Sequence, residues 1–359
     1  MSYTILAINP GSTSTKLALY RDEQPLIHDI AEHSDEDFAC FQDIIDQLEY
    51  RTEIVYSILS KNHVDLSLIQ AVVGRGGLLP PVNAGGYLVT PALKQLITSG
   101  KLSPHASNLG ALIADKIADP LGIPAYIYDS VSSHEFNDIA TITGIPEYRR
   151  YSQCHVLNSK AMGRKVAEKY GQRYEDLNLI VAHLGGGISI GIHEKGRIID
   201  SIGDDSGPFS PERTGSVPLM YIIDLCYSGK YTRKEMIRKI RGLGGMKAHL
   251  GTHDCRQIEK MISEGDEYAK LIYEAEAYQI AKGIGQLAPT LNGDIDYIIL
   301  TGGIAFSEMM TKMITERVKF IAPVEIMPGE VEMEALAMGA LRILKGEEKA
   351  SVFSTDNSL

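Results

Sequence analysis

Two stretches of this chain repeat one pattern: a short apolar run, a loop rich in glycine and hydroxyl groups, and a second apolar run. In the first stretch, Ile5–Arg21, residues 5–8 are apolar and the turn sequence NPGS follows at residues 9–12. Proline fixes φ and glycine permits a positive φ, so we expect two strands joined by a tight turn. The N–H groups and hydroxyls of such a tip can hold phosphate oxygens, and Lys16 adds a positive charge. This stretch alone fits an ordinary hairpin with a polar tip equally well.

The same pattern returns in the middle of the chain. Residues 179–183 form an apolar run, residues 185–187 are three glycines, and residues 188–193 resume the apolar alternation. Long helical patterns separate the two stretches, which predicts an α/β protein of two related halves with a cleft between them. Neither the P-loop nor the dinucleotide-binding fingerprint fits, because the glycines of HLGGGISIG lie inside a hairpin rather than at the start of a helix.

Charge and composition exclude several classes of protein. The chain has 359 residues, 44% of them hydrophobic, and a formal net charge of −11. It has no lysine- or arginine-rich block, so a broad nucleic-acid face is not expected. No apolar run reaches the length of about 20 residues that a membrane helix needs, and the N-terminus does not read as a signal peptide. The four cysteines show no metal-binding spacing, so we expect reduced thiols in a cytoplasmic protein.

Helical and strand patterns cover most of the remaining chain. Ser34 and Asp37 resemble a capping box, and the apolar spacing from Phe38 to Leu59 predicts one long amphipathic helix after them. Further helices are expected at residues 91–99, 106–118, 216–226, 233–241, 266–291 and 332–344, and further strands at residues 70–73, 125–128, 196–199 and 297–300.

Three glycine-containing tips point to a nucleotide. They are NPGSTST (9–15), HLGGGIS (183–189) and TGGIAFSE (301–308). Glycine lets the backbone approach a phosphate closely. The third tip also follows a strand and opens a helix, so its N–H groups are able to face an anion. Each tip alone is more often a plain turn, but the three together predict a nucleotide-phosphate site.

Two arginines and two histidines are candidates for the chemistry. Arg75 lies in a glycine-rich loop and Arg213 lies in SPERTGS, and arginine's planar fork matches carboxylate and phosphate oxygens. His155 and His183 are able to donate to a phosphoryl group. The simpler alternatives are solvated surface charges for the arginines and buried, satisfied side chains for the histidines.

Two acidic residues and one possible metal set complete the candidates. Asp129 ends the strand AYIYD, where α/β proteins place working residues. Glu334 opens the last helix, where the helix dipole also favours an acid for structural reasons. His249, His253 and Cys255 resemble a zinc set, but no fourth ligand stands at a suitable spacing.

The order and spacing of six motifs resemble the acetate kinase branch of the actin-like phosphotransferase superfamily. Within that branch the motifs are most similar to those of butyrate kinases, and the match runs from Ile5 to about Leu344. The six motifs are AINPGSTSTK, AVVGRGGLLPPV, YDSVSSHE, AHLGGGISI, SPERTGS and LTGGIAFSE.

The resemblance implies a fold and a reaction. The fold would be two actin-like (ribonuclease H-like) α/β domains with a cleft, an N-terminal domain at residues 1–152 and a nucleotide-binding domain at residues 153–333. The C-terminal helix, residues 334–359, would pack back on the first domain. The reaction would be reversible transfer of the ATP γ-phosphoryl group to butyrate, with Mg²⁺, giving butanoyl phosphate and ADP. A homo-oligomer, a dimer or higher, is also expected.

Several alternative activities stay open. The nearest are the same transfer to acetate, propionate or a branched acid such as isobutyrate. More distant ones are a sugar kinase and a nucleotide-driven actin-like ATPase of the same superfamily. Asn9 argues against the ATPase, because related ATPases usually carry Asp at this position.

The resemblance also assigns roles to residues. Arg75 and Arg213 match the two active-site arginines, and His155 matches a histidine that stabilises the transferring group. Asp129 and Glu334 match acidic residues that support the metal and orient the arginines. The implied catalytic residues are Arg75, Asp129, His155 and Arg213; the ATP-binding residues Asn9, Ser12, Lys16, His183, Gly185, Gly186, Gly187, Gly302 and Gly303; and the metal-supporting residues Asn9 and Glu334.

Three positions depart from the acetate kinase pattern. Gly186 stands where that pattern has Asn, which bears on the phosphate contacts. Gly77 and Cys154 stand where that pattern has bulky apolar residues. The resemblance therefore implies that Gly77 and Cys154 line a wider acceptor pocket.

Overall fold

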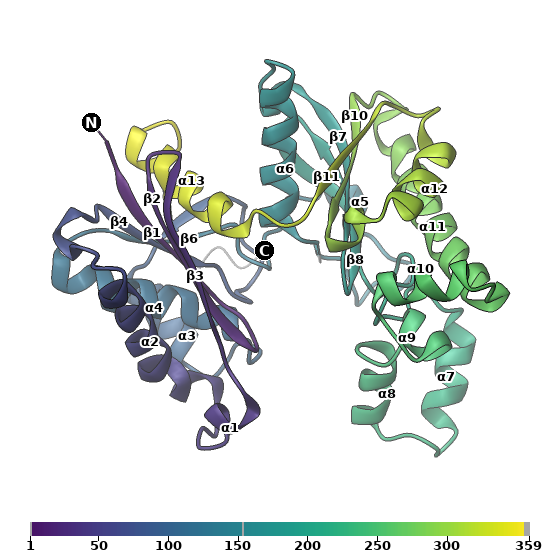
Figure 1. Cartoon of the computed structure of the whole chain (residues 1–359), viewed down its shortest axis with the longest axis horizontal. Coiled ribbons are helices and arrows are strands. Elements are labelled where there is room, and N and C mark those ends of the chain that lie inside the picture. Colours follow the sequence, from purple (N-terminus) through teal and green to yellow (C-terminus); the bar gives the residue numbers. More distant parts are fainter. Residues whose placement is uncertain (1, 153, 355–359) are drawn as a thin grey trace. The chain divides into compact units, whose positions relative to one another are not determined.

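The computed structural model describes residues 2–152 and 154–354, and the chain divides into two compact units (Figure 1). Unit 1 contains the chain up to His134 together with the segment from Val331 onward, and unit 2 runs from Glu135 to Glu330. The domain boundaries expected from the sequence, at residues 152 and 333, stay a prediction. Within the described residues, no helix is both long and apolar enough to cross a membrane.

Unit 1 is built on a seven-stranded sheet in the order β12-β5-β6-β4-β1-β2-β3. β1, β2 and β3 form an antiparallel meander, and β4 and β6 run parallel to β1. The hairpin expected around residues 9–12 is thereby confirmed. The strands are β1 (Thr4–Pro10), β2 (Ser14–Arg21), β3 (Gln24–Glu32), β4 (Ala71–Arg75), β5 (Gly86–Leu88), β6 (Ala125–Tyr128) and β12 (Ser351–Val352).

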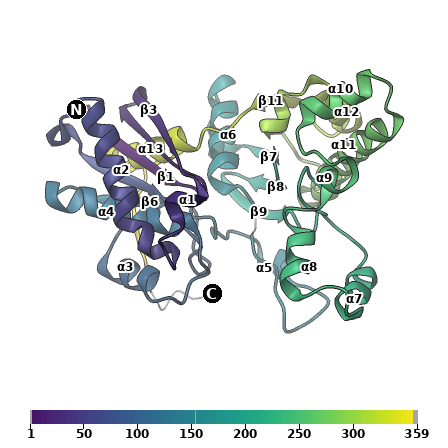
Figure 2. The ribbon, with the colours of Figure 1, turned by 60° about the horizontal axis from the view of Figure 1, so that its bottom comes forward.

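Helices cover both faces of this sheet (Figures 1 and 2). α2 and α4 pack on one face, where alternate residues of β1 such as Leu6 and Ile8 join the core with residues of these two helices. α13 packs on the other face, against β1, β2 and β4. The helices are α1 (Asp35–Phe38), α2 (Leu48–Lys61), α3 (Pro91–Thr98), α4 (Leu109–Ala118) and α13 (Glu332–Lys345).

The single long helix expected after Ser34 is wrong. Ser34 and Asp37 do form the capping box, but α1 ends after four residues, at Phe38, and α2 begins only at Leu48. The carboxylate of Asp46 accepts the backbone N–H groups of Gln42 and Asp43, at 3.2 and 2.9 Å. Such local side-chain bonds to the backbone compete with a continuous helix, and a short 3₁₀ turn at Ile44–Gln47 leads into α2.

Unit 2 repeats the core of this topology. Its five-stranded sheet has the order β11-β10-β7-β8-β9, which matches the order β6-β4-β1-β2-β3 in unit 1. β7, β8 and β9 form an antiparallel meander, and β10 and β11 run parallel to β7. The two related halves expected from the sequence are thus present. The strands are β7 (Asn178–Leu184), β8 (Ile188–Glu194), β9 (Arg197–Ile202), β10 (Tyr297–Gly302) and β11 (Val324–Pro328).

The helices of unit 2 lie on both faces of its sheet. α11 and α12 pack together over one face and share the main core with β7, β8 and β10. α6 covers the other face, against β7 and β10 (Figure 1). The helices are α5 (Asp138–Thr141), α6 (Val156–Lys169), α7 (Leu219–Tyr227), α8 (Arg233–Ile240), α9 (Gly245–Leu250), α10 (Cys255–Ser263), α11 (Glu267–Leu287) and α12 (Glu308–Val318).

Candidate active site

In each unit, the candidate residues gather where parallel strands end. Asn9, Arg75 and Asp129 lie at or just after the carboxyl ends of β1, β4 and β6. His183 and Gly302 lie at the carboxyl ends of β7 and β10. This edge is where α/β sheets bind ligands, because the loops that follow the strands converge there.

In unit 1, a carboxylate joins Asn9 to Arg75. The Asn9 amide nitrogen donates to Glu332 at 2.7 Å, and the Arg75 guanidinium forms an ion pair with the same carboxylate at 2.6 Å. Asn9 is buried, and its amide oxygen has no hydrogen-bond partner among the described residues. The group therefore presents a buried oxygen acceptor beside a fixed cation.

Glu332, rather than Glu334, makes these contacts. Both residues lie in the first turn of α13, where the helix dipole favours acids. Glu334 lies within electrostatic range of Tyr20 and helps to raise the pKa of that phenol, after the larger effect of burial. The role implied for Glu334 stays a prediction, and Glu332 is a contact that sequence reasoning missed.

Asp129 has a backbone conformation that marks a special position. Its φ is +40°, a left-handed value that non-glycine residues rarely adopt. Its carboxylate accepts the backbone N–H of Gly85 at 2.8 Å, and its own N–H donates to the carbonyl of Gly85 at 3.1 Å. The two bonds hold the side chain, which is almost fully buried, at the end of β6.

A buried arginine of α2, Arg51, holds the loop between β1 and β2 through hydrogen bonds. Arg51 of α2 donates to the carbonyl of Ser14 and to the hydroxyl of Thr15, at 3.1 and 2.9 Å, and burial lowers the pKa of its guanidinium to about 10. In the same hairpin, Ser12 is exposed at the tip. Lys16 is half-buried and pairs with Asn9 in the register of β1 and β2. Arg51 is a second contact that the sequence did not single out.

Gly77 is required by close packing. A Cβ at this position would lie 2.1 Å from the side-chain oxygen of Asn108 and 2.7 Å from the Cα of the same residue. That oxygen also accepts the N–H of Leu78 at 2.7 Å. A larger side chain cannot be added at residue 77 without moving the backbone, so substitution there is no test of the acceptor pocket.

In unit 2, the two candidate histidines are stacked. The rings of His155 and His183 lie 3.8 Å apart between centroids with an interplanar angle of 15°. His183 is a buried residue near the end of β7, whereas His155 immediately precedes α6. The structure therefore brings together two residues that are 28 positions apart in the sequence.

Neighbouring polar groups fix the orientation of both rings. The amide of Asn158 donates to Nδ1 of His183 at 3.1 Å, so the neutral ring carries its proton on Nε2. That Nε2 lies 3.4 Å from the carboxylate of Glu330. The hydroxyl of Ser189 lies 2.9 Å from Nδ1 of His155. Asn158, Ser189 and Glu330 carried no sequence signal, because only the fold brings them to the histidines.

The glycine loop and Arg213 lie side by side in the same unit. A Cβ on Gly187 would approach the side chains of Asp204 and Arg213 at 3.6 and 3.9 Å, and one on Gly185 would approach Nε2 of His183 at 3.3 Å. Ser210 donates to the carbonyl of Gly186 at 2.7 Å. These contacts join the loop at residues 185–187 to the SPERTGS segment.

Arg213 is held by a carboxylate, as Arg75 is in unit 1. Its Nε donates to Asp204 at 3.3 Å. Arg241 also donates to Asp204, at 3.0 Å, so one acid serves two arginines. Arg213 keeps about a quarter of its side chain exposed, which leaves part of the guanidinium accessible to an anion.

The third glycine tip packs against the second. Gly302 has a φ of +88°, and a Cβ there would lie 2.4 Å from the carbonyl oxygen of Leu184. Gly302 and Gly329 exchange two backbone hydrogen bonds of 3.0 Å. Gly303 is exposed and a Cβ there would meet nothing within 4 Å. Gly302 therefore serves packing, while Gly303 presents open backbone.

Cys154 precedes His155 and is buried. Its thiol lies 3.3 Å from the hydroxyl of Ser152, and burial raises the thiol pKa to about 11. The zinc set considered from the sequence does not form: His249 contacts the Tyr268 hydroxyl at 2.9 Å, and no metal-binding group of three or more His, Cys, Asp or Glu is present among the described residues.

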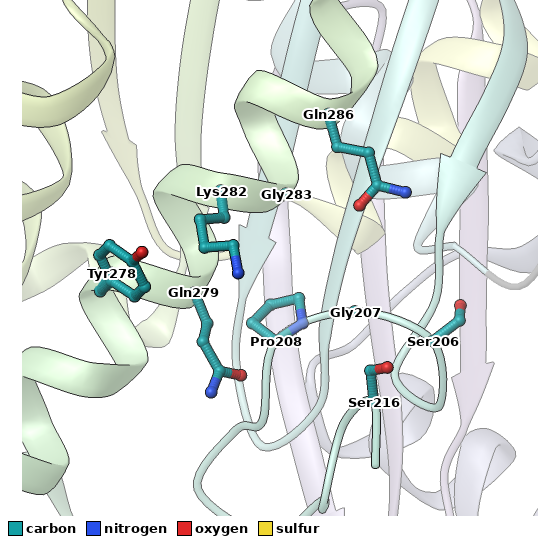
Figure 3. Close-up of a pocket in the computed structure, with 9 residues that line it drawn as sticks. All are labelled: Ser206, Gly207, Pro208, Ser216, Tyr278, Gln279, Lys282, Gly283 and Gln286. Atoms are coloured by element: carbon teal, nitrogen blue, oxygen red, sulfur yellow. The ribbon is translucent and has the colours of Figure 1, made fainter. Parts of the chain in front are cut away.

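A separate pocket of about 300 Å³ lies between α11 and residues 206–208 and 216 (Figure 3). Lys282, Gln279 and Gln286 of α11 line one side, and Gly207 and Ser216 line the other. Gln279 also accepts the N–H of Phe209 at 3.1 Å, which ties the segment to α11. None of the residues implied by the family resemblance lines this pocket.

Comparison with known proteins identifies relatives over the whole chain. The chain is 47% identical over 352 residues to a protein named probable butyrate kinase 2 from Caldanaerobacter subterraneus subsp. tengcongensis, covering 98% of this chain and 99% of the relative. It is 44% identical over 355 residues to a probable butyrate kinase of Clostridium botulinum, covering 98% and 100%.

A solved structure and a family model agree with these relatives. The crystal structure of Porphyromonas gingivalis acetate kinase matches with a TM-score of 0.78 and 19% identity, covering 95% of this chain and all of that one. The likeness shows that the two-sheet architecture is the actin-like fold of acetate kinases. Residues 140–340 match the model of the acetokinase family. This chain therefore belongs to the acetokinase family of carboxylate kinases.

Proposed function

We propose that this protein transfers the γ-phosphoryl group of ATP reversibly to butyrate, giving butanoyl phosphate and ADP. The observation that carries the proposal is the identity of 44–47%, over nearly the full chain, to relatives named probable butyrate kinase. The arrangement of charged groups and glycines at the strand ends supports the reaction class. Acetate, propionate and isobutyrate are the alternative acceptors.

The chemistry of the acceptor explains which groups are needed. A short fatty acid has a pKa of about 4, so it is ionised at neutral pH and needs no general base. A carboxylate oxygen forms a bond to the γ-phosphorus while the bond to the bridging oxygen of ADP breaks. The barrier is the repulsion between two anions, and catalysis consists of positioning and charge stabilisation.

We assign the phosphate contacts of unit 2 to five groups. Nε2 of His183 carries the ring proton and donates to a phosphate oxygen, and the N–H groups of the loop at residues 185–187 do the same. Gly302 shapes the third tip, and Gly303 offers exposed backbone for the nucleotide. His155, stacked on His183, stabilises the transferring group, and Arg213 neutralises its charge.

We assign the groups of unit 1 to the acceptor, the metal and the first phosphate loop. Glu332 holds the guanidinium of Arg75 in place. The planar guanidinium then binds the carboxylate of the acceptor or the oxygens of the transferring phosphoryl group. Asp129 acts as an acidic support at the end of β6. Ser12 and Lys16 contact phosphate from the first loop.

The residues of unit 1 fit a magnesium ion bound with ATP. Mg²⁺ prefers oxygen ligands and keeps few protein contacts, most of its shell being substrate phosphates and water. The buried amide oxygen of Asn9, which lacks a hydrogen-bond partner among the described residues, is a suitable oxygen. Glu332 and Glu334 would support it. The ion would supply charge neutralisation on the phosphates.

A screen of acceptors tests this function. The purified protein is incubated with ATP, Mg²⁺ and hydroxylamine, and acyl phosphate is trapped as the hydroxamate for acetate, propionate, butyrate and isobutyrate in turn. We expect the highest kcat/KM with butyrate. A higher value with another acid would replace butyrate by that acid. ATP turnover that depends on glucose, or on no acceptor, would overturn the proposal in favour of a sugar kinase or an ATPase.

A further inference from the structure

Side chains of α10, of α11 and of the residue that caps α12 meet at the end of the third glycine tip. The hydroxyl of Ser307, in this tip, donates to the carboxylate of Glu259 at 2.5 Å. The phenol of Tyr273 donates to the same carboxylate oxygen at 2.7 Å. Glu259 belongs to α10, Tyr273 to α11, and Ser307 immediately precedes α12; these helices lie together in Figure 1. One carboxylate oxygen therefore joins the tip to two helices of unit 2.

Ser307 makes more hydrogen bonds than a helix cap requires. Its oxygen accepts the N–H of Met310 at 2.9 Å, which is the ordinary bond of an N-cap serine. Its hydroxyl proton goes to Glu259 in addition. Tyr273 is fully buried, and burial raises the pKa of its phenol well above the usual value, so the phenol stays protonated and donates. A buried tyrosine and a carboxylate therefore fix the orientation of one serine side chain.

The backbone of the tip is anchored at both of its ends. At the first end, Gly302 exchanges two hydrogen bonds of 3.0 Å with Gly329. At the second end, the N–H of Ser307 donates to the carbonyl of Ile304 at 2.9 Å and closes the 3₁₀ turn Gly303–Phe306. A turn that begins with glycine has more conformations to lose than other turns, so the positions of its N–H groups depend on these anchors.

We propose that Glu259 and Tyr273 are positioning residues for the nucleotide. They hold Ser307 and, through it, hold the N–H groups of residues 303–306 in the conformation that accepts ATP. The inference rests on the proposed function in one respect, which is that the third tip binds the nucleotide. Donors that are already in place lose no free energy to ordering when the ligand binds. The loss of this support should therefore appear as weaker nucleotide binding.

Nucleotide affinity tests the proposal. Glu259→Ala removes the acceptor and should raise the KM for ATP, and the Kd for ADP measured by titration calorimetry, about 10-fold, the equivalent of one hydrogen bond to a charged group. The KM for butyrate and kcat at saturating ATP should stay near the parent values, because the change affects nucleotide binding alone. Glu264→Ala, at the C-cap of the same helix, is the matched control and should bind ADP as the parent does.

Two conservative variants separate hydrogen bonding from packing. Glu259→Gln keeps an acceptor oxygen on a side chain of the same shape and should restore most of the affinity that Glu259→Ala loses. Tyr273→Phe removes one hydroxyl and should weaken ADP binding by a smaller factor. Tyr268→Phe is its matched control, because Tyr268 is an exposed tyrosine on the same helix. A purely structural role would lower the free energy of unfolding, measured in urea, and leave the affinity for ADP unchanged.

A double substitution tests the route through Ser307. Ser307→Ala should weaken ADP binding about as much as Glu259→Ala does. In the Ser307→Ala background, Glu259→Ala should cause little further loss, because both substitutions remove the same contact. Amide exchange at residues 303–307 gives a readout that is independent of turnover. ADP should slow this exchange in the parent and slow it less in Glu259→Ala, with equal protection of β7 and β8 in both proteins.

Three outcomes would overturn the proposal. A parent-like Kd for ADP in Glu259→Ala would show that the contact supports stability alone. Additive losses in the double variant would show that Glu259 does not act through Ser307. A parent that makes acyl phosphate while ADP leaves exchange at residues 303–307 unchanged would place the nucleotide elsewhere, and the proposed function would still stand. Protection of these residues by ADP without acyl phosphate formation would instead contradict the proposed function alone.

Discussion

At the carboxyl ends of β1 and β4, unit 1 holds the Asn9 amide and the Arg75 guanidinium, and both contact the carboxylate of Glu332 on α13. The corresponding strand ends of unit 2 hold two stacked imidazoles and a run of glycines, with Arg213 beside them. The five core strands follow the same order in both units. The repeated topology thus supplies a position for function, and the residues placed there supply the chemistry.

The two units also differ in what fixes their site residues. Arg75 is held by Glu332, which arrives from α13, more than 250 residues later in the chain. His183 is oriented by Asn158, from α6, which packs on the same sheet. In both units the orienting residue lies on a helix that packs against the sheet carrying the residue it orients. We therefore expect the orienting residues to affect activity nearly as much as the residues they hold.

The largest expected effect lies in unit 2. Arg213→Lys keeps the charge but loses the planar fork. We expect kcat for acyl phosphate formation, measured by hydroxamate trapping, to fall about 100-fold or more. Arg241→Lys is the matched control, because Arg241 donates to the same carboxylate of Asp204 yet is nearly half exposed. Near-normal turnover by the Arg213 variant would remove this residue from the mechanism.

The next effect distinguishes two acids of unit 1. Glu332→Gln removes the charge that holds Arg75, and we expect the Mg²⁺ concentration at half-maximal rate to rise about 10- to 100-fold, as is usual for residues that orient metal ligands. Glu334→Gln, two residues later on α13, is the control. Equal effects of both substitutions would mean that Glu334 supports the metal as directly as Glu332. A larger effect at Glu334 would reverse the assignment.

Much of the architecture was predictable from local sequence patterns. The two hairpins, the strand before Arg75 and the long helix α11 were all expected, because apolar period and turn residues act over short distances. α6 and β3 were not expected. β3 carries Pro25 and alternates exposed with half-buried residues, which is typical of an edge strand, and α6 contains Gly163 against the ring of Tyr174. The formation of β3 and α6 therefore depends on tertiary packing rather than on local sequence patterns.

Only those site residues that stand in recognisable sequence motifs were predictable. Arg75, His183 and Arg213 stand in short motifs that the family resemblance assigns. Glu332 and Asn158 stand in ordinary helical sequence, and only the fold brings them to their partners. Gly77 shows the reverse error: a missing side chain suggested room for a substrate, whereas the position is occupied by Asn108. A sequence reports the absence of a side chain but not what fills the space.

A pH experiment tests how unit 2 tolerates buried ionisable groups. Burial, with smaller effects from Lys160 and Arg164, lowers the pKa of His193 to about 3. Between pH 6.5 and 3 the unfolded chain binds a proton that the folded chain does not, so stability falls as pH falls. Burial raises the pKa of Glu276 well above its usual value. Above pH about 4.5 the folded chain keeps a proton that the unfolded chain releases, so this group makes stability rise as pH falls.

The two groups therefore oppose each other in the parent protein. In Glu276→Gln the free energy of unfolding should fall between pH 6.5 and pH 5, with His193 contributing about 2 kcal/mol of the fall, because Glu276 no longer opposes it. In His193→Gln it should rise over the same range. Urea unfolding followed by circular dichroism measures both, with the parent as reference. His33 of unit 1 also has a lowered pKa from burial, so His33→Gln shows how much of the acid sensitivity comes from that residue. Identical pH profiles in all four proteins would contradict the assignment.

The smallest expected effect decides which unit limits the acceptor. Gly77 of unit 1 cannot accept a side chain, so the test falls on the buried Cys154 of unit 2. Burying two extra methylenes is worth about 1.6 kcal/mol, or roughly 15-fold in kcat/KM for butyrate over acetate. Cys154→Met adds flexible bulk, and we expect it to remove most of that preference. Cys255→Met, at a partly buried cysteine on α10, controls for general destabilisation. If the Cys154 variant keeps the parent ratio of butyrate to acetate, neither of the two positions selects chain length, and the limit of the acceptor pocket must lie with other residues.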